Sequence, residues 1–355
     1  MDIKWCNETS QWDDIILAGD IGGTNTNLAL LGQVGSGFEI IVECVFPSKD
    51  ITNLLEPLKK TLEVAKEKNP QLVPTKACIC GAGPVNENYC TLTNCTWDID
   101  GNQLSQDLGI PLQVINDFLA ISYGVLTLDH SDPSQIHPLT HLDGSTPEPK
   151  NSTKLVVGPG TGLGVSYLVW DGSRYIPSSS EGGHMTFPPY DSEMKELAEY
   201  MERTQGVPCG AELFVSGTGM GYIYNFYKDS GKAPNNEAWQ KIEDSEPRNR
   251  PKLISMASDS DEAAANLMRL FTRMLARYCS DASALLLPYG GLYLAGGIAG
   301  KDMRWFERDQ LFMQLFEKNY NSNIRPLLKK VPVYIVKNYS ISLHGAANAA
   351  VHLIK

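Results

Sequence analysis

The chain has 355 residues, of which 42% are hydrophobic and 20% are charged. This length and composition predict a globular protein of about two domains and exclude fibrous and intrinsically disordered proteins. Thirty lysines and arginines stand against 41 aspartates and glutamates, so the formal net charge is -11. Because such a charge repels nucleic-acid backbones and anionic lipid headgroups, we expect neither nucleic acid nor a membrane as a partner.

The eight cysteines are scattered along the chain. They form neither a CxxC pair nor a grouping with histidine at the spacing of zinc ligands, which favours reduced cytosolic thiols. Cys78 and Cys80 alternate within an apolar run, and we interpret them as buried strand residues. Asp2, Asp13 and Asp14 lie near the N-terminus, and no apolar segment follows a basic start there. The sequence therefore predicts a cytoplasmic protein.

Two segments share one pattern, in which an apolar strand, a glycine–threonine turn and a second apolar strand follow each other. The first segment covers residues 15–31 and the second covers residues 155–170. Each pattern predicts a β-hairpin with a glycine turn. The two halves of the chain are thus expected to open in the same way.

Helices are predicted where apolar residues recur at helical spacing. This spacing occurs in residues 48–68, where Ser48 or Asp50 could cap the helix, and again in residues 267–278 and 312–316. Residues 129–152 and 229–252 are rich in serine, proline, asparagine and charged residues, so they are expected to be loops or insertions.

The two glycine–threonine turns have the composition of anion-binding turns. Neither a G-x-x-x-x-G-K-[ST] loop nor a G-x-G-x-x-G fingerprint occurs in the chain, so the common nucleotide-binding loops are excluded. Glycines allow positive φ and close approach, and the hydroxyls of Thr24 and Thr161 can donate to an anion. One such turn is usually a simple hairpin, but two in this order favour phosphate binding. Asp20 could contact Mg²⁺ on two phosphates, or it could be an Asx-turn residue.

Several motifs resemble those of the bacterial-type glucokinases, within the actin, heat-shock ATPase and sugar-kinase superfamily. Residues 19–25 and 158–164 resemble the two phosphate motifs of this superfamily, and residues 294–298 resemble its adenosine motif. Residues 344–347 are similar to the start of its closing helix. The glucokinase resemblance rests on four further segments in the family's order, which are residues 92–97, 115–118, 181–184 and 212–217.

This resemblance implies an α/β fold class, with two ribonuclease-H-like α/β domains and a cleft between them. The small domain would comprise residues 1–116 plus 342–355, and the large domain residues 117–341. The implied ligands are glucose, ATP and Mg²⁺, with Mg²⁺ held by Asp20 through water, and the implied assembly is a homodimer. The positions that match ATP-binding motifs are Asp20, Gly22, Gly23, Thr24, Asn25, Gly160, Thr161, Gly162, Gly296 and Gly297.

The chain departs from the family pattern in two places. Family members usually carry arginine three residues after the threonine of the first phosphate motif, and here Asn27 occupies that position. The zinc-binding cysteine cluster of the related repressor and kinase group is absent, since Cys209 is the only cysteine between Cys95 and Cys279. That group and its N-terminal DNA-binding helices are therefore disfavoured.

Asp117 is the candidate general base for a sugar hydroxyl. A hydroxyl is a poor nucleophile until its proton is removed, and kinases place a carboxylate within hydrogen-bond reach for this purpose. Asp117 follows an apolar strand at residues 112–115, so it is expected at a strand end, where α/β folds bind ligands. Asn116 and Asp117 could instead cap a helix that starts at Phe118. The resemblance favours the catalytic role.

The remaining sugar-binding candidates are polar residues that can hydrogen-bond to ring hydroxyls. Glu181, His184 and Glu212 match the family's positions, and Asn116 joins them. Each alone would be interpreted as a surface carboxylate or a satisfied core histidine. Asn94 is a weaker candidate, which could instead hold the turn before Trp97.

The leading hypothesis is an ATP-dependent glucokinase that phosphorylates D-glucose at the 6-hydroxyl to give glucose 6-phosphate. Two other functions remain open at this point. The chain could phosphorylate another hexose or an amino sugar on the same scaffold. It could also be a non-catalytic, actin-like ATP-binding module, which would need both turns but neither Asp117 nor the pair of Glu181 and His184. A panel of hexoses with ATP and Mg²⁺ would distinguish these alternatives.

Overall fold

The computed structural model describes residues 1–7, 11–206 and 208–354, and the chain divides into two compact units. The first unit comprises Met1–Ser131 and Asn338–Lys355, and the second comprises Asp132–Lys337. Helix α3 (Asp117–Val125) belongs to the first unit because it packs against α13 (Ile341–Leu353). The first unit therefore extends beyond residue 116, the predicted boundary.

A six-stranded sheet in the order β1-β4-β3-β2-β5-β9 forms the centre of the first unit. Strands β1 to β4 pair antiparallel, whereas β2, β5 and β9 run parallel. The strand bounds are β1 Asp2–Trp5, β2 Asp14–Ile21, β3 Asn25–Val34, β4 Gly37–Pro47, β5 Lys76–Gly81 and β9 Leu112–Asn116. A small second sheet contains β6 Val85–Asn86, β7 Tyr89–Cys90 and β8 Ile99–Asp100.

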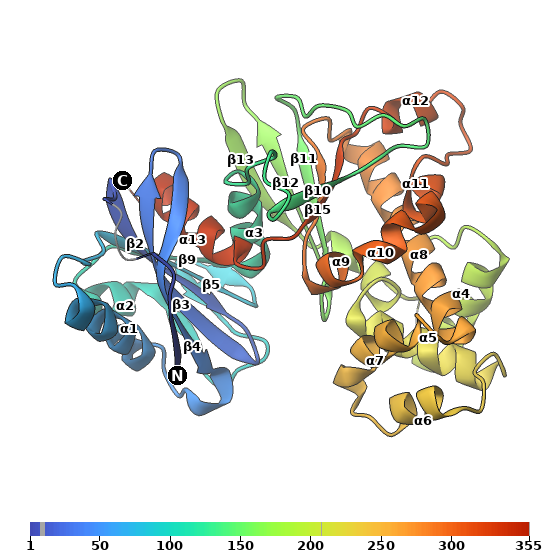
Figure 1. Cartoon of the computed structure of the whole chain (residues 1–355), viewed down its shortest axis with the longest axis horizontal. Helices are drawn as coiled ribbons and strands as arrows, with labels where there is room; N and C mark the ends of the chain where they lie inside the picture. The colour runs from blue at the N-terminus through green and yellow to red at the C-terminus, as the bar shows by residue number, and fades with distance from the viewer. Residues whose placement is uncertain (8–10, 207, 355) are drawn as a thin grey trace. The chain divides into compact units, whose positions relative to one another are not determined.

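Helices cover both faces of this sheet (Figure 1). Helices α1 (Leu55–Lys68) and α2 (Gly101–Leu108) lie on one face, and α3 and α13 lie on the other. A strand that is buried on both sides needs a continuous apolar run, which is the pattern that β2 carries. Cys78 and Cys80 are both 0% exposed within β5, which confirms their interpretation as buried strand residues.

The sheet of the second unit has the order β10-β15-β14-β11-β12-β13. Strands β11, β12 and β13 form an antiparallel meander, and β11, β14 and β15 run parallel. The strand bounds are β10 Ile136–Leu139, β11 Lys154–Pro159, β12 Leu163–Trp170, β13 Tyr175–Ser180, β14 Leu292–Leu294 and β15 Val333–Val336. The strands β13-β12-β11-β14-β15 therefore have the same order and directions as β4-β3-β2-β5-β9 of the first unit. This confirms the predicted α/β fold class of two similar halves.

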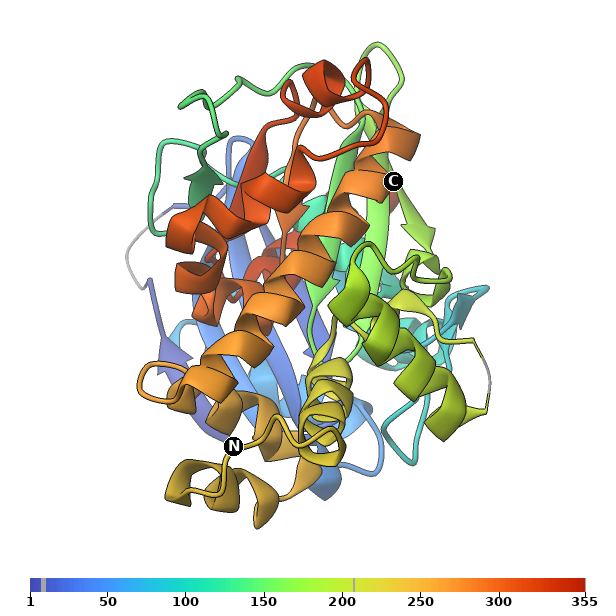
Figure 2. The same cartoon turned by 90° about the vertical axis from the view of Figure 1, so that its right-hand side faces the viewer.

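The helices of the second unit pack mainly around α8 (Glu262–Leu286), the long helix that Figure 2 shows beside α4, α5, α10 and α11. Its apolar side belongs to a large core that also includes one face of the sheet. The other helices are α4 Ser192–Gln205, α5 Gly217–Asp229, α6 Glu237–Glu243, α7 Arg250–Ala257, α9 Gly297–Lys301, α10 Met303–Glu307, α11 Leu311–Phe316 and α12 Arg325–Leu328.

Three local predictions are wrong. No continuous helix starts at Ser48, because Ser48–Asp50 is a short 3-10 turn and α1 begins only at Leu55. Residues 129–152 contain strand β10, and residues 229–252 contain helix α6 and the start of α7, although both segments were expected to be loops or insertions. Two buried apolar side chains, Trp239 and Ile242, anchor α6 within this polar segment.

Neither a disulfide nor a membrane-spanning helix is found in the described parts of the chain. All eight cysteines have free thiols. Within the described residues, no helix is both long enough and apolar enough to cross a membrane.

Candidate active site

The first glycine–threonine turn, residues 22–24, connects β2 to β3 in the first unit. Gly22 N donates to Asn25 O at 2.9 Å, which closes the turn. Gly23 is required for close approach, since a Cβ atom there would lie 2.7 Å from Cβ of Asn94. Gly22 and Gly23 do not have the positive φ that the sequence led us to consider.

Asp20 lies just before this turn, and two neutral donors contact its carboxylate. Ser342 Oγ, in the first turn of α13, donates to Oδ2 at 2.6 Å. Cys80 Sγ, on the neighbouring strand β5, donates to Oδ1 at 3.7 Å. Burial raises the pKa of Asp20, and the two hydrogen bonds oppose this effect. Asn27 pairs with Asp20 across the hairpin, where the family usually has a cation.

The parallel strands bring Asp117 to the same edge of the sheet as Asp20. Ile21, Gly81 and Asn116 are aligned in register at the carboxyl ends of β2, β5 and β9. Asn116 is the N-cap of α3, because its Oδ1 accepts Phe118 N at 2.9 Å and Leu119 N at 3.2 Å. The capping role thus belongs to Asn116, which leaves Asp117 as the first helical residue.

The surroundings of Asp117 make its carboxylate more basic than that of an exposed aspartate. Burial is the main cause that raises its pKa, and the negative charge of Asp20 adds to it, so that the pKa reaches about 6. Oδ1 of Asp117 also accepts the amide of Phe118 at 2.9 Å. At neutral pH the carboxylate is therefore mostly ionised, yet basic enough to accept a proton.

The two asparagines predicted to bind sugar lie in the first unit and already have partners. Asn116 Nδ2 donates to Gly83 O at 3.1 Å, and a side-chain hydrogen bond from Asn116 to Asp117 opposes the rise in the pKa of that carboxyl. Asn94 Nδ2 donates to Thr93 Oγ1 at 3.2 Å, and its Cβ packs against Gly23. Asn94 therefore lies beside the first turn.

The second turn, residues 160–162, connects β11 to β12 in the second unit. Gly160 N donates to Gly162 O at 2.9 Å. Glu212 contacts this turn directly, since its Oε2 accepts Leu163 N at 2.9 Å. A Cβ atom on Gly162 would overlap the same carboxylate. The structure thus brings the sugar-binding candidate Glu212 next to the phosphate-binding candidates.

The glycines of the adenosine motif lie close to the second turn. They follow β14, and Ala295 N donates to Val157 O at 2.9 Å. Gly296 has a φ of 98°, and a Cβ atom there would lie 3.0 Å from Pro159 O. Glycine is therefore required at this position by both its backbone conformation and its close packing on β11.

The remaining sugar-binding candidates, Glu181 and His184, are exposed on a 3-10 turn of the second unit. Glu181 Oε2 lies 3.7 Å from His184 Nε2, and their side chains are 91% and 65% exposed. The next residue, Met185, accepts the amide of Ala211 at 2.7 Å. The segment that carries Glu181 and His184 is therefore joined to the segment that carries Glu212.

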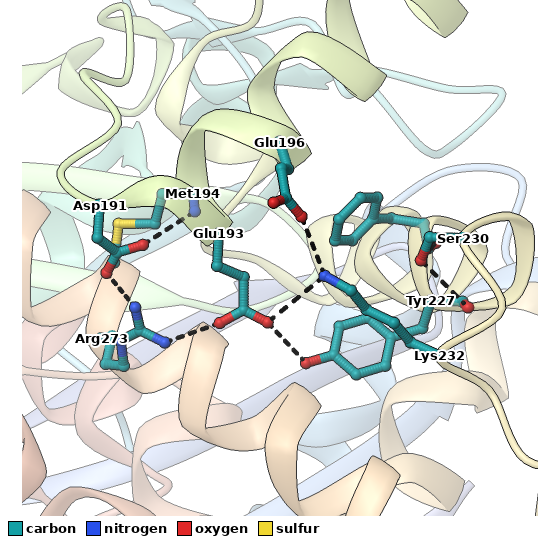
Figure 3. A network of polar contacts seen from close by, with 9 residues as sticks. Asp191, Glu193, Met194, Glu196, Tyr227, Ser230, Lys232 and Arg273 are labelled. Atoms are coloured by element: carbon teal, nitrogen blue, oxygen red, sulfur yellow. Dashed lines mark hydrogen bonds and ion pairs between the residues drawn. The ribbon is translucent and has the colours of Figure 1, made fainter.

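The segment that carries Glu181 and His184 leads to Asp191 at the start of α4. An ion-pair network that the sequence analysis missed holds this point in place (Figure 3). Asp191 caps α4 by accepting Met194 N at 3.0 Å, and it also pairs with Arg273 of α8. Arg273 Nη1 lies 2.9 Å from Glu193 Oε2, and Lys232 Nζ lies 4.0 Å from the other oxygen of Glu193. These contacts link the start of α4 to α8 and to the segment after α5.

Comparisons with known proteins point to one family. A sequence model of the family described as Glucokinase matches residues 17–353 of the chain. A glucokinase of Nostoc punctiforme is 33% identical over 353 residues, which cover 96% of this chain and 99% of the relative. A glucokinase of Synechocystis sp. is also 33% identical and covers 94% of this chain and 97% of its own length.

Solved structures agree with this similarity. The crystal structure of a glucokinase from an Antarctic psychrotroph has a TM-score of 0.79 and 26% identity, covering 96% of this chain and 99% of that one. A glucokinase from Balamuthia mandrillaris in complex with glucose has a TM-score of 0.75 at 20% identity, with coverage of 95% and 94%. A ROK family glucokinase from Streptomyces griseus, in complex with glucose and AMPPNP, has a TM-score of 0.62 at 17% identity, with coverage of 95% and 99%.

The resemblance seen in the motifs thus extends over nearly the whole chain. It also extends to the fold, because the solved glucokinases align along almost their full length. These matches favour an enzyme over the non-catalytic ATP-binding module. We conclude that this chain belongs to the glucokinase family and is a sugar kinase.

Proposed function

We propose that this protein transfers the γ-phosphoryl group of ATP to the 6-hydroxyl of D-glucose, with Asp117 as the general base. The observation that carries the proposal is the environment of Asp117, whose pKa is raised to about 6 by burial and by Asp20. The carboxylate takes the proton of the 6-hydroxyl while that oxygen forms a bond to the γ-phosphorus. The bond between the γ-phosphorus and its bridging oxygen breaks, and ADP leaves.

The phosphates of ATP are assigned to the two glycine–threonine turns. Within residues 22–25 and 160–162, the amides of Gly22 and Gly160 close the turns, and those of Gly23, Thr161 and Gly162 can bind anions without a net positive charge. Gly296 and Gly297 are assigned to the adenosine part, since Gly296 packs against the end of β11 beside the second turn. The AMPPNP complex of the Streptomyces griseus relative is consistent with ATP as the phosphoryl donor.

Asp20 is suited to hold Mg²⁺ through water. Each of its carboxylate oxygens accepts a hydrogen bond from one side chain, Ser342 or Cys80, and each oxygen can accept a second hydrogen bond, here from water. Mg²⁺ keeps several waters and is usually held by one or two carboxylates together with substrate phosphates. When bound, the ion supplies charge neutralisation of the phosphates.

Glucose is assigned to Asn94, Asn116, Asp117, Glu181, His184 and Glu212. These groups offer several acceptors and a few donors, which suits a ring with many hydroxyls. A sugar that lacks a matching hydroxyl would leave a polar group unpaired, at a cost of about 1–3 kcal/mol. The glucose complex of the Balamuthia mandrillaris relative makes glucose the first substrate to test.

The deciding experiment is a coupled assay with ATP and Mg²⁺ across glucose, mannose, fructose and N-acetylglucosamine. We expect the highest kcat/KM for glucose. A higher value for another sugar would assign this scaffold to that sugar instead. No turnover with any sugar would contradict the proposal.

The assembly follows from the resemblance, and the location follows from the scattered cysteines, which favour reduced cytosolic thiols. We propose a cytoplasmic homodimer that supplies glucose 6-phosphate to glycolysis. Light scattering on the purified protein would test the dimer, and a mass of one chain would contradict it.

A further inference from the structure

Each phosphate turn is held by one hydroxyl residue from outside its hairpin. In the first turn this residue is Ser48, which follows β4. Its Oγ donates to Gly22 O at 2.6 Å, and its backbone N donates to Thr24 O at 2.9 Å. Ser48 thus directs two carbonyl groups of the turn toward itself.

Thr218 has the same relationship to the second turn. It lies in the first turn of α5, and both its Oγ1 and its backbone N donate to Thr161 O, at 3.0 and 3.2 Å. The preceding residue, Gly217, donates its amide to Gly160 O at 2.8 Å. Two carbonyl groups of the second turn are therefore directed toward the start of α5.

The planarity of the peptide bond converts these contacts into an orientation of the amides. In a trans peptide the C=O and the following N–H point in opposite directions. When Thr218 holds Thr161 O, the amide of Gly162 must point away from α5. The contact of Ser48 with Gly22 O likewise directs the amide of Gly23 away from Ser48.

The amides oriented in this way are free to bind a ligand. Within the described residues, the amides of Gly23, Thr161 and Gly162 donate no hydrogen bond to a backbone or side-chain acceptor. Adjacent N–H groups that point to one side form a concavity that binds anions. The two hydroxyl residues therefore determine where a bound phosphate would meet the backbone.

We propose that Ser48 and Thr218 are positioning residues that hold the two turns in their anion-binding form. This inference rests on the proposed function, in which the turns bind the phosphates of ATP. Neither residue touches the phosphate itself, because each side chain is on the carbonyl side of its turn. Their effect should therefore appear in nucleotide affinity rather than in the chemical step.

The first test compares Thr218→Val with Thr218→Ser. Valine keeps the shape of threonine but removes the hydroxyl donor, whereas serine retains that donor. Thr218 is exposed, so both variants should fold and melt like the parent protein. Calorimetry with ATP and Mg²⁺, without sugar, should show a dissociation constant about two- to tenfold higher for the valine variant only.

Steady-state kinetics give the second readout. In Thr218→Val, KM for ATP should rise by the same factor, while kcat and KM for glucose stay at the parent values. Thr204→Val is the matched control in the second unit, since Thr204 Oγ1 donates to Tyr200 O at 3.0 Å within helix α4. This control should leave the affinity for ATP unchanged.

Ser48→Ala extends the test to the first turn. Ser48 is 3% exposed and also contacts Thr26 Oγ1 at 3.1 Å, so this variant should lose some stability. Ser105→Ala is its control, because Ser105 Oγ donates to Ile110 O at 2.8 Å in the same unit. Only Ser48→Ala should weaken ATP binding.

The outcomes separate this inference from the proposed function. Equal ATP affinities for the valine and serine variants of Thr218 would overturn the positioning role, even if the protein phosphorylates glucose normally. A parent protein that does not bind ATP would overturn the proposed function, and this inference with it.

Discussion

Gly162 packs against the carboxylate of Glu212 so closely that any Cβ atom would overlap Oε2. Gly160, in the same turn, is different, because the nearest atom to a Cβ atom there would be Gly162 O at 3.9 Å. Packing within the protein therefore requires glycine at residue 162 but not at residue 160. A ligand that approaches the turn would explain glycine at residue 160.

This difference predicts opposite effects for two alanine substitutions. Gly160→Ala should keep the melting temperature of the parent but weaken ATP binding, because the methyl group would occupy space needed by phosphate. Gly162→Ala should lower the melting temperature, since it displaces Glu212 and breaks the contact with Leu163 N. Calorimetry with ATP and thermal melting on both variants test this. Unchanged ATP affinity in Gly160→Ala would show that phosphate does not contact residue 160.

Asp117→Asn should lower kcat by about 10²- to 10⁴-fold, the usual contribution of positioned proton transfer. Glucose affinity should fall less, because the other sugar contacts remain. The cap of α3 is retained in this variant, since it is made by Asn116. Steady-state kinetics and glucose binding on one preparation provide the measurement. A variant that binds glucose and turns over near the parent rate would refute the assignment of the base.

The pH dependence of kcat/KM should show an acid limb near pH 6. Asp117 has a pKa of about 6, and only its ionised form can accept the proton of the sugar. The rate should therefore be fully developed above this pH and fall about tenfold for each unit below it. The residual activity of Asp117→Asn should lack this limb. A parent profile that is flat down to about pH 4.5 would contradict the assignment.

The strands and turns could be predicted from the sequence because they depend on local patterns. Strand β12 covers residues 163–170, as predicted, and both hairpins carry their glycine turns at the expected positions. The repeated strand order of the two units follows from these patterns only in part, since the pairing of β14 and β15 joins distant segments.

The surroundings of the site could not be predicted, because they depend on contacts between distant residues. Ser342 and Asp20 are 322 residues apart in the chain, and no local pattern links them. The role of Ser48 was misassigned for a related reason, since a serine before an apolar helical pattern is typical of a helix cap. Its actual partner is the turn at Gly22, across the hairpin.

The packing of α3 on α13 predicts how one added methyl group would affect stability. A Cβ atom on Gly345 would overlap Ala120 O, which is backbone and cannot move aside alone. Gly345→Ala should therefore cost about 1–3 kcal/mol of unfolding free energy. Gly221→Ala is the control, because it lies within α5 with no atom within 4 Å, and it should add up to about 1 kcal/mol. Denaturant unfolding measures both, and equal stabilities would contradict the packing argument.

The final prediction concerns the stability of Asp117→Asn, which should exceed that of the parent at neutral pH. Burial raises the pKa of Asp117 from 3.8 to about 6 in the folded protein. The folded state therefore binds the proton more tightly than the unfolded state, so stability falls as pH rises through this window. Above this pH window, the buried charge of Asp117 lowers the free energy of unfolding by about 1–3 kcal/mol. Asparagine is neutral at every pH and avoids this cost.

The test is denaturant unfolding of both proteins at about pH 7.5 and about pH 4.5. The variant should be more stable at the higher pH, and the difference should shrink at the lower pH, where the parent carboxyl binds its proton. Asp143→Asn is the control of opposite sign, because hydrogen bonds from Ser145 lower the pKa of Asp143 to about 2. That variant should lose stability at the higher pH. If Asp117→Asn is instead less stable than the parent at about pH 7.5, the carboxylate stabilises the fold, and the raised pKa cannot be its dominant property.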